Sequence, residues 1–323
     1  MVVTVTLNPL LERRYFVDNF EKGKTYRVNQ NTYSAGGKGI NVSRELNLLG
    51  IKNLAVFPIG GNKGKIYRTI LEEEGINFYA ISVKSEIRDA ALIIENNYRV
   101  TSFIGENNPL SNEDINKFKT KIAKVYENSS IILFAGSVPN EESAEIICEG
   151  IKRGNELDKI TFLDTYGKHL QTCLDAIPFA VHNTVSEVET SLNISLKTEE
   201  EKLNYLKNLY EKGIKLVFLT DGENPAYAMK FGYLYKIHPP KVSEIDSTGC
   251  GDVFVAGIIH GLEKDNVFKE FLKYATALAS TNAKMLYTAK VKFEDAENLL
   301  DKVTIEEIGP KMKIIDDSPN YEQ

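Results

Sequence analysis

A glycine-rich turn that leads into an apolar helix carries the strongest chemical signal in the chain. Residues 246–252 read Asp-Ser-Thr-Gly-Cys-Gly-Asp, and small and apolar residues follow over Val253–Leu262. Glycine lets a backbone approach a ligand closely. The first N–H groups of a helix have no partner within the helix, so they attract anions. Asp252 adds a carboxylate that could accept a proton from a hydroxyl group beside a bound anion, which is worth about 10²–10⁴ in rate.

The same turn also admits a purely structural interpretation. An acidic residue in a first helical turn stabilises the helix by about 0.3–1 kcal/mol, and Asp246 or Ser247 would act as its cap. A helix N-terminus can lower the pKa of a thiol such as that of Cys250, although we expect this residue to fill space and supply its backbone N–H. The chain contains neither a Walker string nor a dinucleotide-binding fingerprint, which argues against P-loop enzymes and Rossmann dehydrogenases.

A second glycine-rich turn lies near the start of the chain, where residues 35–44 read Ala-Gly-Gly-Lys-Gly-Ile-Asn-Val-Ser-Arg. Lys38 could bind an anionic group, while Asn41 and the backbone at Gly37 could bind the hydroxyl groups of a polyol. The alternative is a simple strand-to-helix turn with Asn41 as the N-cap. Because both loops have the same design, we expect them to face each other across one pocket.

The elements that would position these loops follow an alternating pattern. Continuous apolar runs such as 131–135 are typical of strands buried on both faces, and their alternation with helices predicts a parallel sheet covered by helices. The expected strands are Val2–Leu7, Leu54–Ile59, Ile131–Ala135, Ile160–Leu163 and Leu216–Thr220, and the expected helices are Asn41–Leu49, Lys65–Glu74, Asn112–Glu127, Ala144–Arg153 and Glu199–Lys212.

Two regions, 12–34 and 86–105, break the alternation with short runs that favour strands. Within the second, Ala90–Glu95 and Tyr98–Ile104 flank Asn96-Asn97, which could form a two-residue turn because asparagine tolerates positive φ. We expect these regions to form a small second sheet that acts as a lid. The alternative is that they are edge strands of the main sheet.

Composition excludes several other classes of protein. The 323 residues are 42% hydrophobic, and 39 basic and 45 acidic side chains give a formal net charge of −6. These values are typical of a globular protein, and the mild acidity argues against a nucleic-acid partner. We also expect no membrane segment and no secretory signal. Three scattered cysteines and four histidines without ligand spacing indicate neither a disulfide framework nor a zinc site, so we expect a cytoplasmic protein.

With both loops in view, the sequence resembles the ribokinase-like (PfkB) carbohydrate kinases, and within them the branch with 1-phosphofructokinase and tagatose-6-phosphate kinase. The Gly-Gly-Lys-Gly-x-Asn-Val run of residues 36–42 and the Thr-Leu-Asn-Pro run of residues 6–9 are typical of that branch. Further similarities lie at Gly136-Ser137-Val138-Pro139, at Asp164-Thr165-x-Gly167 and at Gly222. The resemblance covers about residues 2–300.

The resemblance implies a three-layer α/β sandwich with a mostly parallel central sheet and a small β-sheet lid. The core would comprise 1–11, 35–85 and 106–308, the lid 12–34 and 86–105, and the tail 309–323. ATP, with Mg²⁺, would donate a phosphoryl group to a hydroxyl of a ketohexose phosphate. Fructose 1-phosphate is favoured over tagatose 6-phosphate, and two copies of the chain would pair through their lids.

The resemblance also implies a role for particular residues. Asp252 would be the general base, and the N–H groups of Gly249, Cys250 and Gly251 would form the anion hole. The substrate's own phosphate would be held by Lys38, Arg27 and Arg88, and its sugar by Glu12, Gly37, Asn41 and Ser137. The nucleotide would contact Thr184, Thr220, Gly222, Gly249 and Gly251, and Glu187 would organise Mg²⁺ through water.

Four positions depart from the family pattern. Glu12 stands where the branch has Asp, and one extra methylene moves its carboxylate by over an ångström. His182-Asn183-Thr184 replaces Lys-Pro-Asn before the retained Glu187, with Val188 and Leu192 on the apolar face of the next helix. Pro225 stands where the family normally has a second glycine. Val253 follows the proposed base at a position where a smaller residue is more usual. Two alternatives stay open. One is a kinase of an unphosphorylated sugar or nucleoside, against which the cations Lys38, Arg27 and Arg88 argue. The other is a sugar-phosphate-binding protein with weakened kinase activity, which the changes at Thr184 and Pro225 suggest.

Overall fold

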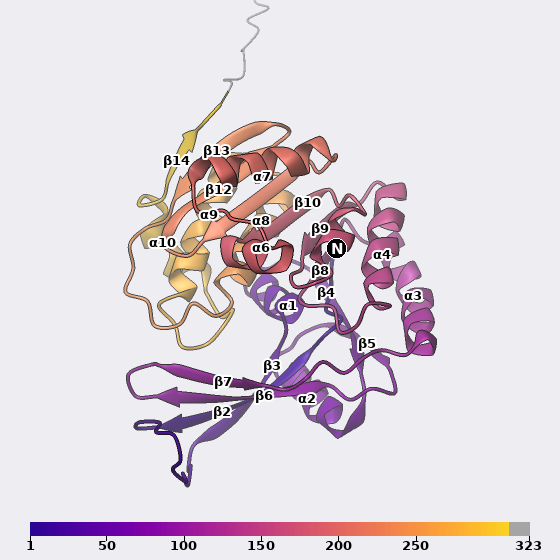
Figure 1. Ribbon diagram of the computed structural model, residues 1–323, viewed down its shortest axis with the longest axis vertical. Coiled ribbons are helices and arrows are strands. Elements are labelled where there is room, and N and C mark those ends of the chain that lie inside the picture. Colours follow the sequence, from indigo (N-terminus) through magenta and orange to yellow (C-terminus); the bar gives the residue numbers. More distant parts are fainter. Residues whose placement is uncertain (310–323) are drawn as a thin grey trace, which may run out of the picture.

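A ten-stranded sheet forms the centre of the computed structural model, which describes residues 1–309 (Figure 1). The strand order is β14-β13-β12-β11-β10-β9-β8-β1-β4-β5. The strands from β11 to β5 run parallel, and β12, β13 and β14 are antiparallel at one edge. Their bounds are β1 Val2–Val5, β4 Asn53–Ile59, β5 Phe78–Ser82, β8 Ile131–Ala135, β9 Ile160–Asp164, β10 Ala180–Thr184, β11 Leu216–Asp221, β12 Asn224–Lys230, β13 Tyr233–His238 and β14 Thr304–Glu307.

Helices cover both faces of this sheet. Helices α3 to α7 pack on one face, and α1, α8, α9 and α10 pack on the other. The bounds are α1 Lys38–Leu48, α2 Gly61–Glu73, α3 Asn112–Glu127, α4 Ala144–Glu156, α5 Leu170–Leu174, α6 Val185–Leu192, α7 Glu199–Glu211, α8 Cys250–Glu263, α9 Phe268–Asn282 and α10 Phe293–Leu300. The expected α/β sandwich with a mostly parallel sheet is therefore confirmed.

The central strands are buried on both faces, as their apolar runs predict. Ile132 and Phe134 of β8 face the α3–α7 layer, whereas Ile131 and Leu133 face the layer that contains α1 and α8. Side chains alternate between the faces of a strand, so one short segment contributes to two cores. The five expected strands and five expected helices are all present, with bounds that differ by up to four residues.

A separate four-stranded sheet lies beside the core, with the order β3-β2-β6-β7 (Figure 1). Its strands are β2 Leu10–Val17, β3 Asn31–Gly36, β6 Arg88–Glu95 and β7 Val100–Ile104. The alternative that these regions are edge strands of the main sheet is therefore wrong. Strands β2 and β3 each extend two residues beyond the expected limits of the lid, and we keep the division into core, lid and tail as a proposal.

The turn between β6 and β7 differs from the expected two-residue form. The Tyr98 N–H donates to the Glu95 carbonyl at 2.8 Å, and the Glu95 N–H donates to the Arg99 carbonyl at 3.0 Å. Tyr98 has a φ of 66°, and neither asparagine has a positive φ. The connection is thus a three-residue loop that ends in a left-handed residue, and our assignment of that conformation to Asn96-Asn97 is wrong.

The lid is anchored at the end that joins the core. Leu11 and Ala35 of the lid strands pack in one cluster with Phe57 of β4 and Tyr67 of α2. The Tyr67 hydroxyl donates to the Gly36 carbonyl at 2.7 Å. This contact fixes the strand that runs directly into the first glycine loop.

None of the helices in residues 1–309 is long and apolar enough to cross a membrane. The expected tail, 309–323, lies outside the described residues apart from Gly309.

Candidate active site

The two glycine loops meet at a direct contact between side chains. Asn41 Nδ2 donates to Asp252 Oδ2 at 2.7 Å, and both residues are buried. The expectation that the loops face one pocket is therefore confirmed. Asn41 lies inside α1, whose N-cap is Gly37 with a φ of 121°, so the interpretation of Asn41 as the N-cap is wrong. Glycine alone adopts that φ readily, which explains why the helix begins three residues earlier.

Gly249 shapes the second loop. It is the N-cap of α8 with a φ of 78°, and a Cβ there would lie 2.0 Å from the Thr288 methyl carbon. Any other residue would meet both backbone strain and a collision. Asp246, an expected cap of α8, instead accepts from the Thr248 N–H at 2.9 Å within the preceding turn.

The amides of this loop are not equivalent. The Cys250 N–H donates to the Ser247 carbonyl at 3.1 Å. The N–H groups of Gly249 and Gly251 have no acceptor within residues 1–309, so they remain free for an anion. Burial raises the pKa of the Cys250 thiol to about 11, which overturns the idea that the helix N-terminus makes this thiol acidic.

Asp252 is almost fully buried at the start of α8. Burial raises the pKa of its carboxyl to about 7, helped by the nearby acids Asp164 and Glu187 and opposed by Lys38 and the hydrogen bond from Asn41. A general base works best when its pKa lies near the operating pH. Asp252 is thus suited to take up and release a proton near neutrality.

Lys38 lies among three acidic side chains. Its Nζ is 2.9 Å from Asp164 Oδ1 and 2.6 Å from Glu187 Oε1. Although burial by itself lowers the pKa of Lys38, the carboxylates of Asp164, Glu187 and Asp252 raise it above its usual value. Lys38 therefore stays charged and partly neutralises these acids, a role that the sequence did not reveal.

His182 is a site residue that we discounted when we considered only metal-ligand spacing. Its Nδ1 lies 3.0 Å from Asp164 Oδ1 and its Nε2 lies 3.1 Å from Thr220 Oγ1. Despite burial, Lys38 and His182 lower the pKa of Asp164, so Asp164 is ionised and Nδ1 carries the proton. Nε2 and the Thr220 hydroxyl form the second hydrogen bond of the ring. The available signal was the position of His182 in a buried strand directly before Thr184.

Thr184 and Glu187 cap helix α6 together. The Thr184 hydroxyl accepts from the Glu187 N–H at 3.2 Å, and Glu187 Oε2 accepts from the Thr184 N–H at 3.0 Å. This capping box, with the ion pair to Lys38, shows that Glu187 is not simply a solvated helix acid. Val188 is fully buried and Leu192 packs against the core, as expected.

The segment after β11 forms a hairpin with an irregularity at Pro225. Leu219 pairs with Tyr227 and Asp221 pairs with Asn224, so Thr220 faces two residues of β12. Proline lacks an N–H, and strands tolerate it at such bulges. Gly222 lies in the exposed turn with a φ of 57°. The departure at Pro225 is thus accommodated within the strand pair.

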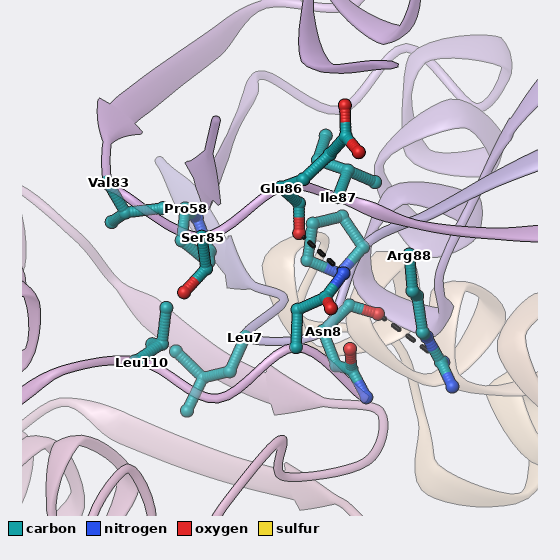
Figure 2. A pocket seen from close by; sticks show the side chains of 11 residues that line it. Leu7, Asn8, Pro58, Val83, Ser85, Glu86, Ile87, Arg88 and Leu110 are labelled. Atoms are coloured by element: carbon teal, nitrogen blue, oxygen red, sulfur yellow. Dashed lines mark hydrogen bonds between the residues drawn. The ribbon is translucent and has the colours of Figure 1, made fainter. Parts of the chain in front are cut away.

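Arg88 and Ser137 gather around Asn8 at the base of the lid. Asn8 Nδ2 donates to Ser137 Oγ at 2.9 Å and to Asn107 Oδ1 at 2.8 Å. Arg88 reaches the Asn8 carbonyl at 3.4 Å, and Figure 2 shows this contact at the edge of the surrounding pocket. The Nε atom of Arg88 is buried and has no partner within residues 1–309.

The lid contributes a pair of charges, of which the sequence singled out only Glu12. Arg14 is buried, and its NH2 atom lies 2.9 Å from Glu12 Oε2. Its guanidinium also lies 5.9 Å from the ring centre of Tyr287, next to the Thr288 that abuts Gly249. The segment Tyr287-Thr288 therefore lies beside both a lid cation and the second glycine loop. Alternation along β2 places Glu12 and Arg14 on the same face.

Arg27 is the predicted phosphate ligand that the structure does not bring to this group. It is exposed in the connection between β2 and β3. The connection begins at the far end of the β2–β3 pair, where Tyr15 pairs with Asn31. That end lies roughly 17 Å from Gly36 at about 3.4 Å per residue. Within residues 1–309, Arg27 forms no hydrogen bond or ion pair with the other predicted site residues.

The acidic side chains of the site would supply only part of the ligands of a magnesium ion. No group of three or more His, Cys, Asp or Glu side chains within residues 1–309 is arranged to hold a metal ion. Both oxygens of Glu187 already have partners, while Asp164 Oδ2 is buried without one. Mg²⁺ commonly binds through one or two carboxylates together with water and substrate phosphates, and this donor set is compatible with that mode.

A covered α/β core, a β lid and a buried carboxylate beside free glycine amides define a phosphotransferase that acts on a sugar hydroxyl. The chain belongs to the pfkB family of carbohydrate kinases, whose model matches residues 7–291.

Two relatives are similar over nearly the whole chain. A 1-phosphofructokinase of Borreliella burgdorferi is 28% identical over 313 residues, which cover 95% of this chain and 99% of the relative. A tagatose-6-phosphate kinase of Staphylococcus epidermidis is 24% identical over 311 residues, which cover 95% of this chain and 100% of the relative.

Solved structures support the fold. Phosphofructokinase-2 from Escherichia coli, in complex with potassium, superposes with a TM-score of 0.86 at 20% identity and covers 93% of this chain and 98% of its own. A ribokinase from Arabidopsis thaliana, complexed with ribose and ATP, superposes with a TM-score of 0.73 at 18% identity and covers 93% of this chain and 98% of its own. The chain is therefore ribokinase-like in fold.

Proposed function

We propose that this protein is a cytoplasmic, ATP-dependent kinase of a ketohexose phosphate, with fructose 1-phosphate converted to fructose 1,6-bisphosphate. The observation that carries the proposal is the contact between Asn41 and Asp252, which unites a polyol-binding loop with a carboxylate and free amides. Kinases of the pfkB family use ATP as the phosphate donor, and Thr184, Thr220 and Gly222 are our proposed nucleotide contacts.

The proposed reaction uses the residues of both loops. Asn41, Gly37 and Glu12 hold the sugar so that one hydroxyl lies beside Asp252. As the hydroxyl oxygen attacks the terminal phosphorus of ATP, Asp252 accepts the hydroxyl proton and ADP leaves. The amides of Gly249 and Gly251 stabilise the charge on the transferred group, because fixed donors in a buried site need no reorganisation.

The substrate's own phosphate accounts for the cations around the sugar site. Arg88 has a buried Nε without a partner within residues 1–309. Lys38 belongs to the first glycine loop, and Arg14 lies on β2, the lid strand that pairs with the strand of Arg88. Arginine binds phosphate oxygens in a forked geometry. We assign the phosphate to Arg88 with Lys38, and we add Arg14 in place of Arg27. Lys38 and Arg14 already have carboxylate partners, so within residues 1–309 it is the guanidinium of Arg88 that an unphosphorylated substrate would leave without an anion.

Magnesium would be held mainly by the phosphates of ATP, with Glu187 as a ligand through water. When bound, it would neutralise phosphate charge, as metal ions do in phosphoryl transfer.

Turnover of a panel of acceptors tests the proposal. ADP release would be measured with fructose 1-phosphate, tagatose 6-phosphate, fructose 6-phosphate, fructose and ribose. We expect the highest kcat/KM with fructose 1-phosphate and at least tenfold less with each unphosphorylated sugar. Equal or faster turnover of fructose or ribose would contradict the assignment of Arg88 and Lys38.

Two alternatives remain separable in the same panel. Preference for tagatose 6-phosphate is supported by the full-length similarity to the tagatose-6-phosphate kinase. A sugar-phosphate-binding protein with weakened kinase activity is supported by the replacement at Thr184 and by the ion pairs that occupy Lys38. Binding of a sugar phosphate in calorimetry without ADP release from any acceptor would favour this second alternative.

We also propose that two copies of the chain pair through their lids. The β7 strand ends in two neighbouring apolar side chains, Phe103 and Ile104, that are 58% and 61% exposed. An exposed edge strand with apolar side chains favours pairing with another chain.

A further inference from the structure

A chain of buried polar groups continues from Asp252 beyond Asn41 to a third helix. Arg44 NH1 donates to Asn41 Oδ1 at 2.8 Å. The same guanidinium donates through Nε and NH2 to Glu74 Oε2, at 3.0 and 2.8 Å. Glu74 is the C-cap residue of α2, so the chain links three separate elements of the fold.

Arg44 is held too firmly to turn away from Asn41. It is 5% exposed, and its NH2 also donates to the Ala35 carbonyl at 2.7 Å. Glu74 is itself held by Lys290, whose Nζ lies 3.3 Å from Glu74 Oε1. Three acceptors from different segments therefore set the position of one planar group.

This arrangement determines which end of the Asn41 amide faces Asp252. An asparagine amide carries an acceptor oxygen and a donor nitrogen of nearly the same size. Because Arg44 only donates, the oxygen of Asn41 must point toward Arg44 and its nitrogen toward Asp252. A reversed amide would direct its oxygen at the carboxylate, which would disfavour the ionised form of Asp252.

We propose that Arg44 is a positioning residue: it orients the Asn41 amide and thereby sets the pH range in which Asp252 is ionised. The proposal rests on the proposed role of Asp252 as the base. Arg44 contacts neither Asp252 nor the proposed position of the reacting hydroxyl, so its hydrogen-bonded link to Asp252 runs through Asn41.

The other charged groups around Asp252 come from different elements. Lys38 approaches from α1, Asp164 from the end of β9 and Glu187 from α6. His182 of β10 lies beside Gly251, which precedes Asp252 in the first turn of α8. Arg44→Lys leaves these groups and the positive charge of residue 44 in place, so a shift in the titration of Asp252 in that variant would report on the Asn41 amide.

The test is a titration that does not depend on activity. Carboxyl-¹³C aspartate would be introduced into the whole enzyme, and the Asp252 resonance would be assigned from its absence in Asp252→Asn. Arg44→Met should move the titration midpoint of Asp252 upward by about one pH unit, the scale of one charge-assisted hydrogen bond. The value of kcat/KM at pH 7 should then be about fivefold lower than in the wild type, and the difference should disappear near pH 9.

Lys290→Met is the matched control, because it removes a cation from the same chain without touching Asn41. It should leave the midpoint in place. An unmoved midpoint in Arg44→Met, or an equal shift in Lys290→Met, would overturn the proposal. Arg44→Met also removes a positive charge, so Arg44→Lys is measured beside it. Lysine keeps the charge, but one ammonium cannot span Asn41, Ala35 and Glu74 together. The same upward shift is expected, and an unmoved midpoint would again refute the role.

The outcome is distinguishable from failure of the proposed function. If Asp252→Asn keeps near-normal turnover, Asp252 is not the base, yet the carboxyl titration still decides whether Arg44 orients Asn41.

Discussion

The ammonium group of Lys38 lies 2.9 Å from the carboxylate of Asp164, although 126 residues separate them in the sequence. Asp164 Oδ1 also faces His182, so one buried oxygen joins the first glycine loop to the strand that leads to α6. Lys38 thus has an electrostatic role before any substrate binds. It lowers the negative charge around Asp252, and a phosphate would have to compete with two carboxylates for it.

We predict that Lys38→Ala raises both the KM for the sugar phosphate and the pH at which activity appears. Loss of the cation removes a phosphate ligand, and it also removes the group that favours the ionised form of Asp252. The acid limb of kcat/KM should move upward by about one pH unit, the effect of roughly 1.4 kcal/mol. Steady-state kinetics from pH 5 to 9 measure both effects. An unchanged KM would count against phosphate binding by Lys38.

Asp252→Asn should reduce turnover by about 10²–10⁴, the range for loss of a general base. The Asn side chain keeps the shape and can still accept from Asn41, so the fold and sugar-phosphate binding should be retained. Turnover and calorimetric binding would be compared with wild type on the same preparation. A variant that turns over normally would remove Asp252 from the role of base.

The same variant should change how stability depends on pH. The pKa of Asp252 is about 7 in the folded protein against an ordinary value of 3.8, so between these values the folded state binds the proton more tightly. This contribution is present at low pH and is lost as the pH rises through 7. The melting temperature of Asp252→Asn, relative to wild type, should therefore increase from pH 5 to pH 8. A constant difference would show that the carboxyl titrates normally.

Gly249→Ala should destabilise the protein and abolish most activity. Its φ of 78° costs about 1 kcal/mol for a residue with a Cβ, and that Cβ would collide with the Thr288 methyl group. Thr288→Ser removes this methyl group, so the double variant should recover part of the lost stability but keep the backbone cost. Chemical unfolding of the four proteins in the cycle measures the coupling. Additive effects would show that Thr288 is not the obstacle.

Ile104→Asp, alone or with Phe103→Asp, should yield monomers if the lids pair. A buried charge without a partner is costly at an apolar interface. Light scattering would compare these variants with wild type and with Val267→Asp, which alters another exposed apolar residue, 62% exposed, on the α/β core. A dimer that persists in both lid variants would place the interface elsewhere.

Local sequence chemistry was sufficient to predict the fold class and the two loops. Short apolar runs such as Ile131–Ala135 have one favourable environment, a strand covered on both faces, and the structure has that strand with the same bounds. The first turns of α1 and α8 depend on glycines within a few residues of Asn41 and Asp252. Asn41 and Asp252 could therefore be singled out without knowledge of any distant contact.

Contacts between distant segments could not be predicted in this way. The sequence alone determined which residues have the chemistry of a kinase site, because residue type and local backbone conformation decide what can donate, accept or approach. Only the tertiary structure decided that Lys38 pairs with Asp164, that His182 bridges to Thr220, and that the lid cation beside Tyr287 is Arg14. These partners depend on which strands become neighbours in the sheet and on where the lid is anchored, and the burial of many residues together sets that arrangement.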